Sequence, residues 1–360
     1  MSKVLVGLSG GVDSAVCAYL LKEKGYDVLG VTLRTWLDSS SEVSKCCELD
    51  DAADIAKALD IPFYIHNVGS LFCHFVTAPF VSDYLHGLTP SPCVICNRRV
   101  KWEGMMNLAD IHNADYVSTG HYANIIRLPN GRLTVKKSSG GKDQAYMLYR
   151  LTQEQLEKTL MPLGNMSKDE VRQIAKKAGI PVAQKPDSQE ICFVEDGHYA
   201  DYVETNAEKF GFSDLLKGEG NFVDESGKIL GRHKGIYHYT IGQRKGLGIA
   251  MGYPVFVKEI RPETNEVVLS EEDALFSDTV FCRDLNFMSL EDIKEGEEIN
   301  ASVKIRYRHE GGRAILTRVD KETIKIVFDK PQRAATAGQS AVFYDDSDCV
   351  IGGGIIVSGN

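Results

Sequence analysis

The sequence contains no run of about 18 apolar residues, which excludes a transmembrane helix. It begins MSKVLVGLSGG and passes straight into a strand-like run without a signal-peptide pattern, which predicts a cytoplasmic protein. Neither an internal repeat nor a low-complexity tract is present. Positive charge is in deficit, because 41 lysines and arginines face 50 aspartates and glutamates, a net charge of −9. A nucleic-acid partner would therefore have to meet a local basic patch and not the overall charge.

Cysteine is present in an odd number, nine, in a chain too long to need disulfide staples, so a secreted disulfide scaffold is excluded. The remaining roles for a cysteine are core filler, metal ligand or reactive thiol. We expect four of them to be small buried hydrophobes, namely Cys17, Cys73, Cys282 and Cys349. Cys46 and Cys47 are adjacent and cannot chelate a metal as a CxxC pair does, so they are also interpreted as filler.

The length of 360 residues predicts two or three domains. Strand-like runs alternate with helical patterns in the first 200 or so residues, and Ser167 to Glu170 form a capping box that predicts a helix start. We expect strands at 4–8, 28–36, 63–68 and 115–119, and helices at 15–24, 50–59, 70–86, 98–112 and 168–178. This alternation predicts an α/β fold with a doubly wound parallel sheet, whose ligands lie beyond the carboxyl ends of the strands.

The texture changes after about residue 205. Glycines interrupt short segments there, which predicts a small strand-containing domain over 206–272. Polar and apolar residues alternate at 301–307, 314–319 and 323–328, the pattern of half-buried antiparallel strands. The predicted order is therefore a domain at 1–205, a small central domain, and a C-terminal antiparallel β-barrel or sandwich at 273–360.

The segment from Ser9 to Ser14, SGGVDS, lies between the first predicted strand and the first helix. Its two glycines allow the backbone to approach an anion closely, and the helix start directs unpaired N–H groups to the same place. Asp13 is a candidate ligand for Mg²⁺ or a helix cap. The loop is not a Walker motif, since it lacks GxxxxGK followed by Ser or Thr. The alternative is a tight turn that only caps the helix.

SGGVDS resembles the phosphate loop of the N-type ATP pyrophosphatases, the PP-loop superfamily with its adenine nucleotide alpha hydrolase-like domain. Further stretches resemble the tRNA-specific 2-thiouridylases of the MnmA/TrmU family, in the family's order and over nearly the whole chain: TPSPCVICNRRVKW at 89–102, STGHYA at 118–123, GKDQAYML at 141–148, DSQEICFV at 187–194, IGQRKGLGI at 241–249, IRYRH at 305–309 and AGQSAVFY at 337–344. The resemblance makes the first domain the ATP pyrophosphatase catalytic domain and implies tRNA binding by the other two.

The implied reaction is the ATP-dependent 2-thiolation of the wobble uridine of tRNA. It needs an oxygen made into a leaving group by adenylation, and a sulfur nucleophile carried as a cysteine persulfide. By resemblance, Cys192 is the persulfide carrier and Cys96 the second, nucleophilic thiol, and the two form a transient disulfide. Arg98, Arg99 and Lys101 would favour the Cys96 thiolate if they face it.

Cys93 departs from the family pattern, in which many members carry an acidic residue that helps proton transfer and contacts the target base. This places the acid–base role in doubt and creates a CxxC pair with Cys96. Cys93, Cys96 and Cys192 together are an alternative three-thiolate shell for an iron–sulfur cluster. A redox or resolving role for Cys93, or a silent substitution, is the other interpretation.

The resemblance also implies binding residues. Those for ATP are Gly7, Leu8, Ser9, Gly10, Gly11, Val12, Asp13, Ser14, Leu33 and Gly120; those for the target base are Ser91, Pro92 and Cys93. Those for tRNA are His121, Lys142, Asp143, Gln144, Arg306, Tyr307 and Gln339. On chemistry alone, Leu33 is as readily a core residue, His121 a satisfied loop histidine, and the basic strand near Arg306 a solvated face.

The expected cofactors are ATP and Mg²⁺, and the expected partners are the tRNA anticodon loop and a sulfur donor such as a cysteine desulfurase or sulfur-relay protein. Two other functions fit parts of the sequence. One is a PP-loop synthetase that adenylates a small metabolite, although no glutaminase domain or amine-binding site is evident. The other is an RNA-binding module with a structural metal on the three cysteines.

Overall fold

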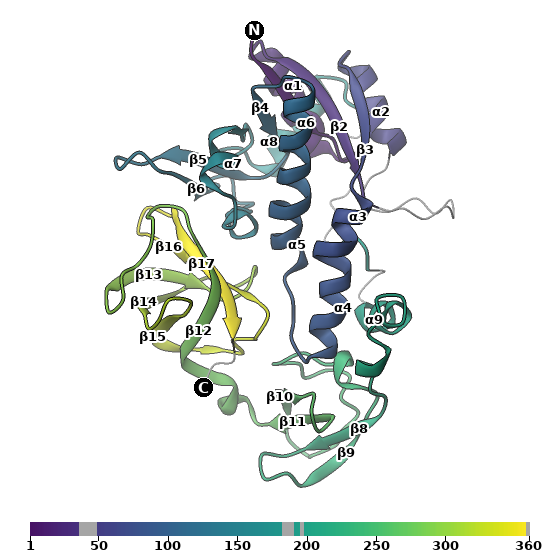
Figure 1. Ribbon diagram of the computed structural model, residues 1–360, viewed down its shortest axis with the longest axis vertical. Helices are drawn as coiled ribbons and strands as arrows, with labels where there is room; N and C mark the ends of the chain where they lie inside the picture. The colour runs from purple at the N-terminus through teal and green to yellow at the C-terminus, as the bar shows by residue number, and fades with distance from the viewer. Residues whose placement is uncertain (36–48, 182–190, 195–197, 358–360) are drawn as a thin grey trace.

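The structure is a computed structural model that describes residues 1–35, 49–181, 191–194 and 198–357. Its catalytic domain is built on a five-stranded parallel sheet (Figure 1). In spatial order the strands are β3 (Phe63–Asn67), β2 (Asp27–Arg34), β1 (Lys3–Gly7), β4 (Tyr116–Ser118) and β7 (Thr159–Leu160). The strand order reverses between β1 and β4, which is the switch point where ligands bind in such sheets. The predicted doubly wound sheet is therefore confirmed.

The helices that cover this sheet are amphipathic or fully buried on the side that faces it. They are α1 (Val12–Glu23), α2 (Leu49–Ala58), α6 (Glu103–Ile111) and α8 (Lys168–Lys177), while the short helix α7 (Gln153–Glu157) packs beside the strand Leu133–Lys137. The predicted capping box is confirmed at α8, where the Ser167 hydroxyl accepts a hydrogen bond from the Glu170 amide and the Glu170 side chain accepts one from the Ser167 amide.

Two long helical rods run from the sheet toward the rest of the molecule (Figure 1). The first joins α3 (Gly69–Phe72), a π-helical turn η1 (Cys73–Thr77) and α4 (Ala78–Leu85). The second joins α5 (Pro92–Ile95), a π-helical segment η2 (Cys96–Trp102) and α6. The second rod begins six residues earlier than the sequence pattern predicts at 98–112, so Cys93 and Cys96 lie on a helix.

The predicted small central domain contains a four-stranded sheet in the order β10-β11-β8-β9. Its strands are β8 (Gly220–Val223), β9 (Ile229–His233), β10 (Phe256–Arg261) and β11 (Glu266–Ser270). The helix α9 (Tyr199–Ala207) precedes it and packs on α4 through stacked Tyr84 and Tyr199 rings, 4.7 Å apart. The proposed domain boundary at residue 205 falls inside this helix.

The C-terminal domain is a closed antiparallel barrel, which decides between the predicted barrel and sandwich. Its strands, in order around the barrel, are β12 (Phe276–Phe287), β15 (Ile324–Arg333), β14 (Gly312–Arg318), β13 (Glu298–Lys304), β16 (Ser340–Tyr344) and β17 (Val350–Val357). Apolar side chains alternate inward along β13, β14 and β15 as the sequence predicts.

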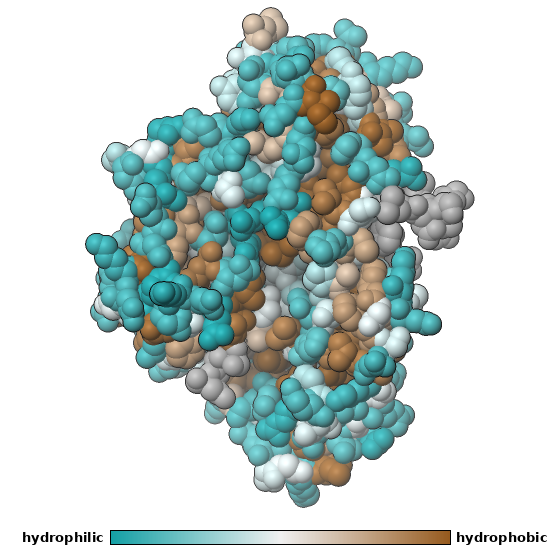
Figure 2. Space-filling view, viewed as in Figure 1, coloured by the Kyte–Doolittle hydropathy of each residue, from teal (hydrophilic) through white to brown (hydrophobic). Residues whose placement is uncertain are grey.

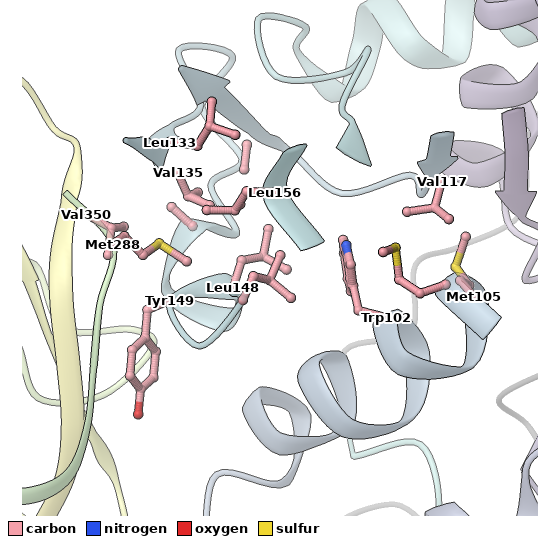
Figure 3. Close-up of a cluster of buried hydrophobic side chains, with 14 of the residues drawn as sticks. Trp102, Met105, Val117, Leu133, Val135, Leu148, Tyr149, Leu156, Met288 and Val350 are labelled. Atoms are coloured by element: carbon pink, nitrogen blue, oxygen red, sulfur yellow. The ribbon is translucent and has the colours of Figure 1, made fainter. Parts of the chain in front are cut away.

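The barrel docks on the catalytic domain through a hairpin that the sequence pattern does not predict, β5 (Ala123–Arg127) and β6 (Leu133–Lys137). Met288 and Val350 of the barrel share a buried cluster with Leu133 and Val135 of the hairpin (Figure 3). That cluster continues to Trp102 at the sheet end of the second rod. The other short elements are one-turn helices η3 (Ala145–Leu148), η4 (Ser213–Leu215), η5 (Ile236–His238) and η6 (Glu272–Leu275).

Figure 2 shows the face on which the barrel, the rods and the central domain surround a hollow. None of the helices in the described part of the chain is long and apolar enough to cross a membrane.

Candidate active site

The loop from Ser9 to Ser14 closes on itself between β1 and α1. Gly10 takes a positive φ of 74°, a conformation that glycine adopts readily. The Ser14 hydroxyl donates to the Gly11 carbonyl over 2.9 Å and accepts from the Ser9 amide over 3.1 Å. These bonds preshape the loop at the N-terminus of a 12-residue helix, whose free N–H groups and dipole favour an anion.

The segment after β4 fits directly against this loop. A side chain at Gly120 would place its Cβ only 2.6 Å from the Ser14 amide nitrogen, so glycine alone allows this approach. Beneath the loop, the Cys17 sulfur lies 3.1 Å from the Ser118 hydroxyl, and burial raises the pKa of Cys17 to about 12. Cys17 is therefore an inert core residue, as expected, and Gly120 lies at the predicted nucleotide site.

Asp13 lies at the centre of a cluster of charged side chains beside the phosphate loop. Its carboxylate lies 3.2 Å from Lys142 Nζ and 2.7 Å from Lys168 Nζ, and it accepts a hydrogen bond of 2.6 Å from the Tyr122 hydroxyl. No side-chain cap is present at the start of α1, so the alternative role of Asp13 as a helix cap is wrong. Lys168 is not among the site residues predicted from the sequence, although the capping box beside it marks the start of α8.

Lys142 was predicted to contact tRNA, and the structure places its ammonium group at the phosphate loop. It lies 4.8 Å from the centre of the Tyr122 ring as well as against Asp13. The next two residues turn back into the domain. The Asp143 carboxylate accepts from the Ser138 amide, and the Gln144 side chain accepts from the Tyr122 amide.

Cys96 lies at the point where the second rod widens from α-helix to π-helix. Such π-helical turns are rare and occur often at functional sites. The Cys96 side chain is 8% exposed and packs in a buried cluster that also contains Val68, Phe72 and Val100. The next residue, Asn97, donates to the Met147 carbonyl over 3.0 Å, which ties the widened turn to η3.

Cys192 belongs to the same buried cluster as Cys96. Its neighbour Phe193 packs edge-on against Phe72 and Phe80, with ring centres 5.6 and 5.0 Å apart. The two cysteine segments therefore converge on the first rod although 96 residues separate them. Cys192 is disulfide-bonded in the structure. A transient disulfide between Cys96 and Cys192 during turnover, which the resemblance implies, stays a prediction. Cys46 and Cys47 lie outside the described residues.

Cys93 is exposed at the start of the second rod. Loss of water to the surrounding protein raises its pKa, and the charge of Lys101 only partly opposes this. A raised pKa disfavours the thiolate of Cys93, which does not favour the acid–base role of the family's acidic residue at this position. Cys93, Cys96 and Cys192 are all described, and among the described residues no three cysteine, histidine or acidic side chains are arranged to hold a metal. The three cysteines are therefore not arranged as the ligand shell that the iron–sulfur and structural-metal alternatives require.

His121 lies between the phosphate loop and the second rod. Its Nδ1 is 2.7 Å from the Thr119 hydroxyl, and its ring centre is 5.5 Å from that of Trp102. Desolvation, assisted by the charges of Lys101 and Lys142, lowers the pKa of His121 to about 3. His121 is therefore a neutral imidazole at physiological pH.

The three other basic residues after Cys96 have identifiable surroundings. Arg99 pairs with Glu103 over 2.7 Å and lies over the Phe75 ring. The charge of Lys101 contributes to the low pKa of His121 and partly opposes the rise in the pKa of Cys93. Arg98 lies close enough to Arg150 and Asp284 for their charges to shift its pKa. Leu33 is the next-to-last residue of β2, is half-buried, and lies beside Gly104 of α6, where a Cβ would be 3.7 Å away.

The predicted RNA-contacting residues of the barrel face the catalytic domain. The Tyr307 hydroxyl donates to the Asp143 carbonyl over 3.1 Å. The Gln339 amide donates to the carbonyls of Thr89 and Pro90 over 2.9 and 3.2 Å. These bonds connect the barrel directly to the segment that leads into Ser91, Pro92 and Cys93.

Known protein families match the chain in all three domains. Family profiles described as tRNA methyl transferase HUP domain, tRNA methyl transferase PRC-barrel domain and aminomethyltransferase beta-barrel domain match residues 2–196, 213–271 and 277–356. The tRNA-specific 2-thiouridylase MnmA of Lachnoclostridium phytofermentans is 52% identical over 365 residues, which cover 99% of this chain and 100% of that protein. The chain belongs to the MnmA family of tRNA-specific 2-thiouridylases.

Another MnmA protein, from Clostridioides difficile, is 49% identical over 98% of each chain. Among solved structures, the U34-tRNA thiolase NcsA from Methanococcus maripaludis matches 58% of this chain and 66% of its own, with 18% identity and a TM-score of 0.36.

Proposed function

We propose that this MnmA-family chain replaces the C2 oxygen of the wobble uridine of tRNA by sulfur, with the phosphate loop activating the oxygen and Cys192 and Cys96 delivering the sulfur. The observation that carries this assignment of residues is the course of the second rod. Cys96 lies near one end of the rod, and Met105, nine residues further along it, packs against Gly7, where β1 enters the phosphate loop. A base bound along this rod reaches both centres.

ATP binds at the switch point with its phosphates on the loop and its adenine toward Leu33 and Gly120. Lys142 and Lys168 supply positive charge where the α-phosphate is attacked and pyrophosphate leaves. Asp13 holds both ammonium groups in place. Because this carboxylate is engaged by two lysines, Mg²⁺ is expected to arrive on the ATP phosphates, as this ion keeps much of its coordination to substrate and water.

The target uridine leaves its stack, because the C2 oxygen cannot be reached inside the anticodon loop. Attack of that oxygen on the α-phosphorus breaks the bond to pyrophosphate and, with loss of the N3 proton of the uracil to water, gives an adenylated base. His121, held neutral, lies between the phosphate loop and the second rod, and Cys93 lies about one turn beyond Cys96 on that rod. Where many family members carry an acidic residue, this chain carries Cys93, whose thiol we expect to contact the base as a weak hydrogen-bond donor.

Sulfur transfer then proceeds in two balanced steps. The terminal sulfur of the Cys192 persulfide attacks C2, and AMP departs with the former uracil oxygen. The Cys96 thiolate then attacks the Cys192 sulfur, which releases 2-thiouridine and leaves a Cys96–Cys192 disulfide. An external thiol reduces this disulfide, and a sulfur donor such as a cysteine desulfurase or relay protein restores the persulfide.

The test is a reconstituted reaction. Reduced protein, ATP, Mg²⁺, a persulfide donor and an unmodified tRNA transcript are incubated, and the digested RNA is analysed by mass spectrometry. We expect 2-thiouridine and pyrophosphate in equal amounts, and no thiolated nucleoside from the Cys192→Ser variant. Full activity of that variant, or pyrophosphate release that does not depend on RNA, would contradict the proposal. Cys73→Ser, a half-buried cysteine on η1, is the matched control.

A further inference from the structure

A cavity that contains two arginines lies away from the phosphate loop, where the three domains meet. Its volume is about 290 Å³. The catalytic domain contributes Thr89, the central domain Thr240 and Gly242, and the barrel Arg306, Arg333 and Gln339. Arg333 was absent from the binding residues that the resemblance implied. The cavity is therefore a composite site, formed only when all three domains are in place.

Two guanidinium groups share this cavity. Arg306 Nη1 donates to the Arg333 carbonyl over 3.0 Å, and the Arg333 side chain lies over the Phe256 ring, 5.1 Å from its centre. Glu272 pairs with Arg333 over 3.0 Å and is 55% exposed, whereas no carboxylate of the described residues forms an ion pair with Arg306. Loss of water and the charge of Arg333 both lower the pKa of Arg306.

Like charges held together at a partly desolvated site raise the free energy of the unliganded protein. An anion that enters between them removes this penalty. A carboxylate or a phosphate would serve, and a phosphodiester suits the two arginines best, because guanidinium groups bind phosphate oxygens through paired N–H donors. The opening between three domains also suits a group that projects from a longer chain.

We propose that this cavity binds a backbone phosphate of the tRNA, with Arg306 and Arg333 as its cationic clamp. The proposal rests on the proposed function, since it identifies how the same substrate is held. It adds Arg333 as an RNA-binding residue and assigns the central domain a share in the site through Thr240 and Gly242.

The position of the cavity gives the phosphate a second effect. Gln339 in its wall holds the carbonyls of Thr89 and Pro90, and the Thr89 amide donates to the Ala337 carbonyl over 2.9 Å. This segment leads within four residues to Cys93. A phosphate bound in the cavity thus fixes the barrel against the start of the second rod, where the target base is handled.

The experiment is filter binding of an unmodified tRNA transcript, without ATP, over a series of KCl concentrations. Arg333→Ala should weaken binding about tenfold at moderate salt. It should also reduce the slope of log Kd against log salt concentration by about one. Each contact between a cation and a phosphate releases about one counterion from the RNA on binding, and the variant makes one such contact fewer. Arg333→Lys, which keeps the charge, should retain most of the slope. Arg127→Ala, whose exposed side chain pairs with Glu157 outside the cavity, is the control and should behave as the wild type.

Steady-state kinetics of thiolation distinguish weaker tRNA binding by the variant from a loss of folded protein. Arg333→Ala should raise the KM for tRNA and keep kcat near the wild-type value. Wild-type affinity and slope in Arg333→Ala, or weaker binding with an unchanged slope, would overturn the phosphate site while leaving the proposed function intact. Failure of the wild-type protein to bind or thiolate tRNA would instead overturn the proposed function, and with it this site.

Discussion

Lys168 Nζ lies 2.7 Å from Asp13 Oδ1, so the first residue of α8 is held against a loop 155 positions earlier in the chain. Lys168 is only 18% exposed at its side chain, and Asp13 is 21% exposed. An ion pair this sheltered is screened less by salt than one at the surface. The pairing places a fixed positive charge beside the expected position of the ATP phosphates.

The first prediction concerns this lysine. Lys168→Ala should raise the ATP concentration needed for half-maximal pyrophosphate release about tenfold, since one charge-assisted contact to phosphate is lost. The measurement is pyrophosphate release at saturating tRNA. Lys176→Ala, an exposed lysine near the far end of α8, is the matched control and should leave the ATP dependence unchanged. Equal effects of the two substitutions would contradict a role for Lys168 at the nucleotide.

The second prediction traps an intermediate of sulfur transfer. Cys96→Ser lacks the thiol that resolves the linkage, so tRNA should stay joined to Cys192 through a disulfide. A denaturing gel without reductant should show this adduct, and treatment with a thiol should release 2-thiouridylated tRNA. The double variant Cys96→Ser, Cys192→Ser should give no adduct. An adduct that persists in the double variant would show that another cysteine carries the sulfur.

The third prediction concerns pH. The pKa of His121 is about 3 in the folded protein, below its ordinary value of about 6.5. Below pH 6.5 the unfolded chain therefore binds a proton that the folded protein excludes, and the free energy of unfolding falls as pH decreases toward 3. His121→Asn should lose less stability between pH 7.5 and pH 4.5 than the wild type. Urea titrations at the two pH values measure this difference, and parallel losses would contradict it.

The fourth prediction concerns the link between the barrel and the second rod. Gln339→Ala removes two donors from the Thr89 and Pro90 carbonyls, and we expect the free energy of unfolding to fall by about 1 kcal/mol. The kcat of thiolation should fall further than the stability loss explains, because the target-base segment loses its anchor. Gln332→Ala, which breaks a bond to His309, is the control for removing an amide from the same domain. Equal kcat values for the two variants would contradict the link.

Local sequence signals located most of the fold. Alternating strands and helices predicted the parallel sheet, and the Ser167–Glu170 capping box marked the start of α8 within one residue. Polar and apolar alternation located three of the six barrel strands, β13, β14 and β15, because one face of each is buried. Closure into a barrel was not decided by this signal, since a sandwich strand has the same period of two.

Other features depend on contacts between distant residues. The sequence pattern predicts that the second rod begins at 98, whereas it begins at Pro92, which occupies the first helical turn, where proline lacks only an N–H that would be unpaired. The sequence pattern predicts that Lys168 lies on a helix. It does not predict that the side chain points to Asp13, because that contact joins residues far apart in the chain. Lys142 was assigned to RNA from the resemblance, and only the fold reveals that its ammonium group lies at the phosphate loop.

The π-helical segment that begins at Cys96 limits how the length of this helix could vary. Each residue added to a helix turns the remainder of that helix by about 100°, and a π turn accommodates roughly one residue more than an α turn. Because the wide turn already absorbs one extra residue, deleting a single residue between 96 and 102 would restore regular winding and keep the two halves of the rod in nearly the same relative orientation. The same deletion in a regular α-helical part of the rod would instead turn Cys93 by about 100° relative to the sheet. The orientation of one thiol toward its substrate thus depends on where along the rod a residue is lost.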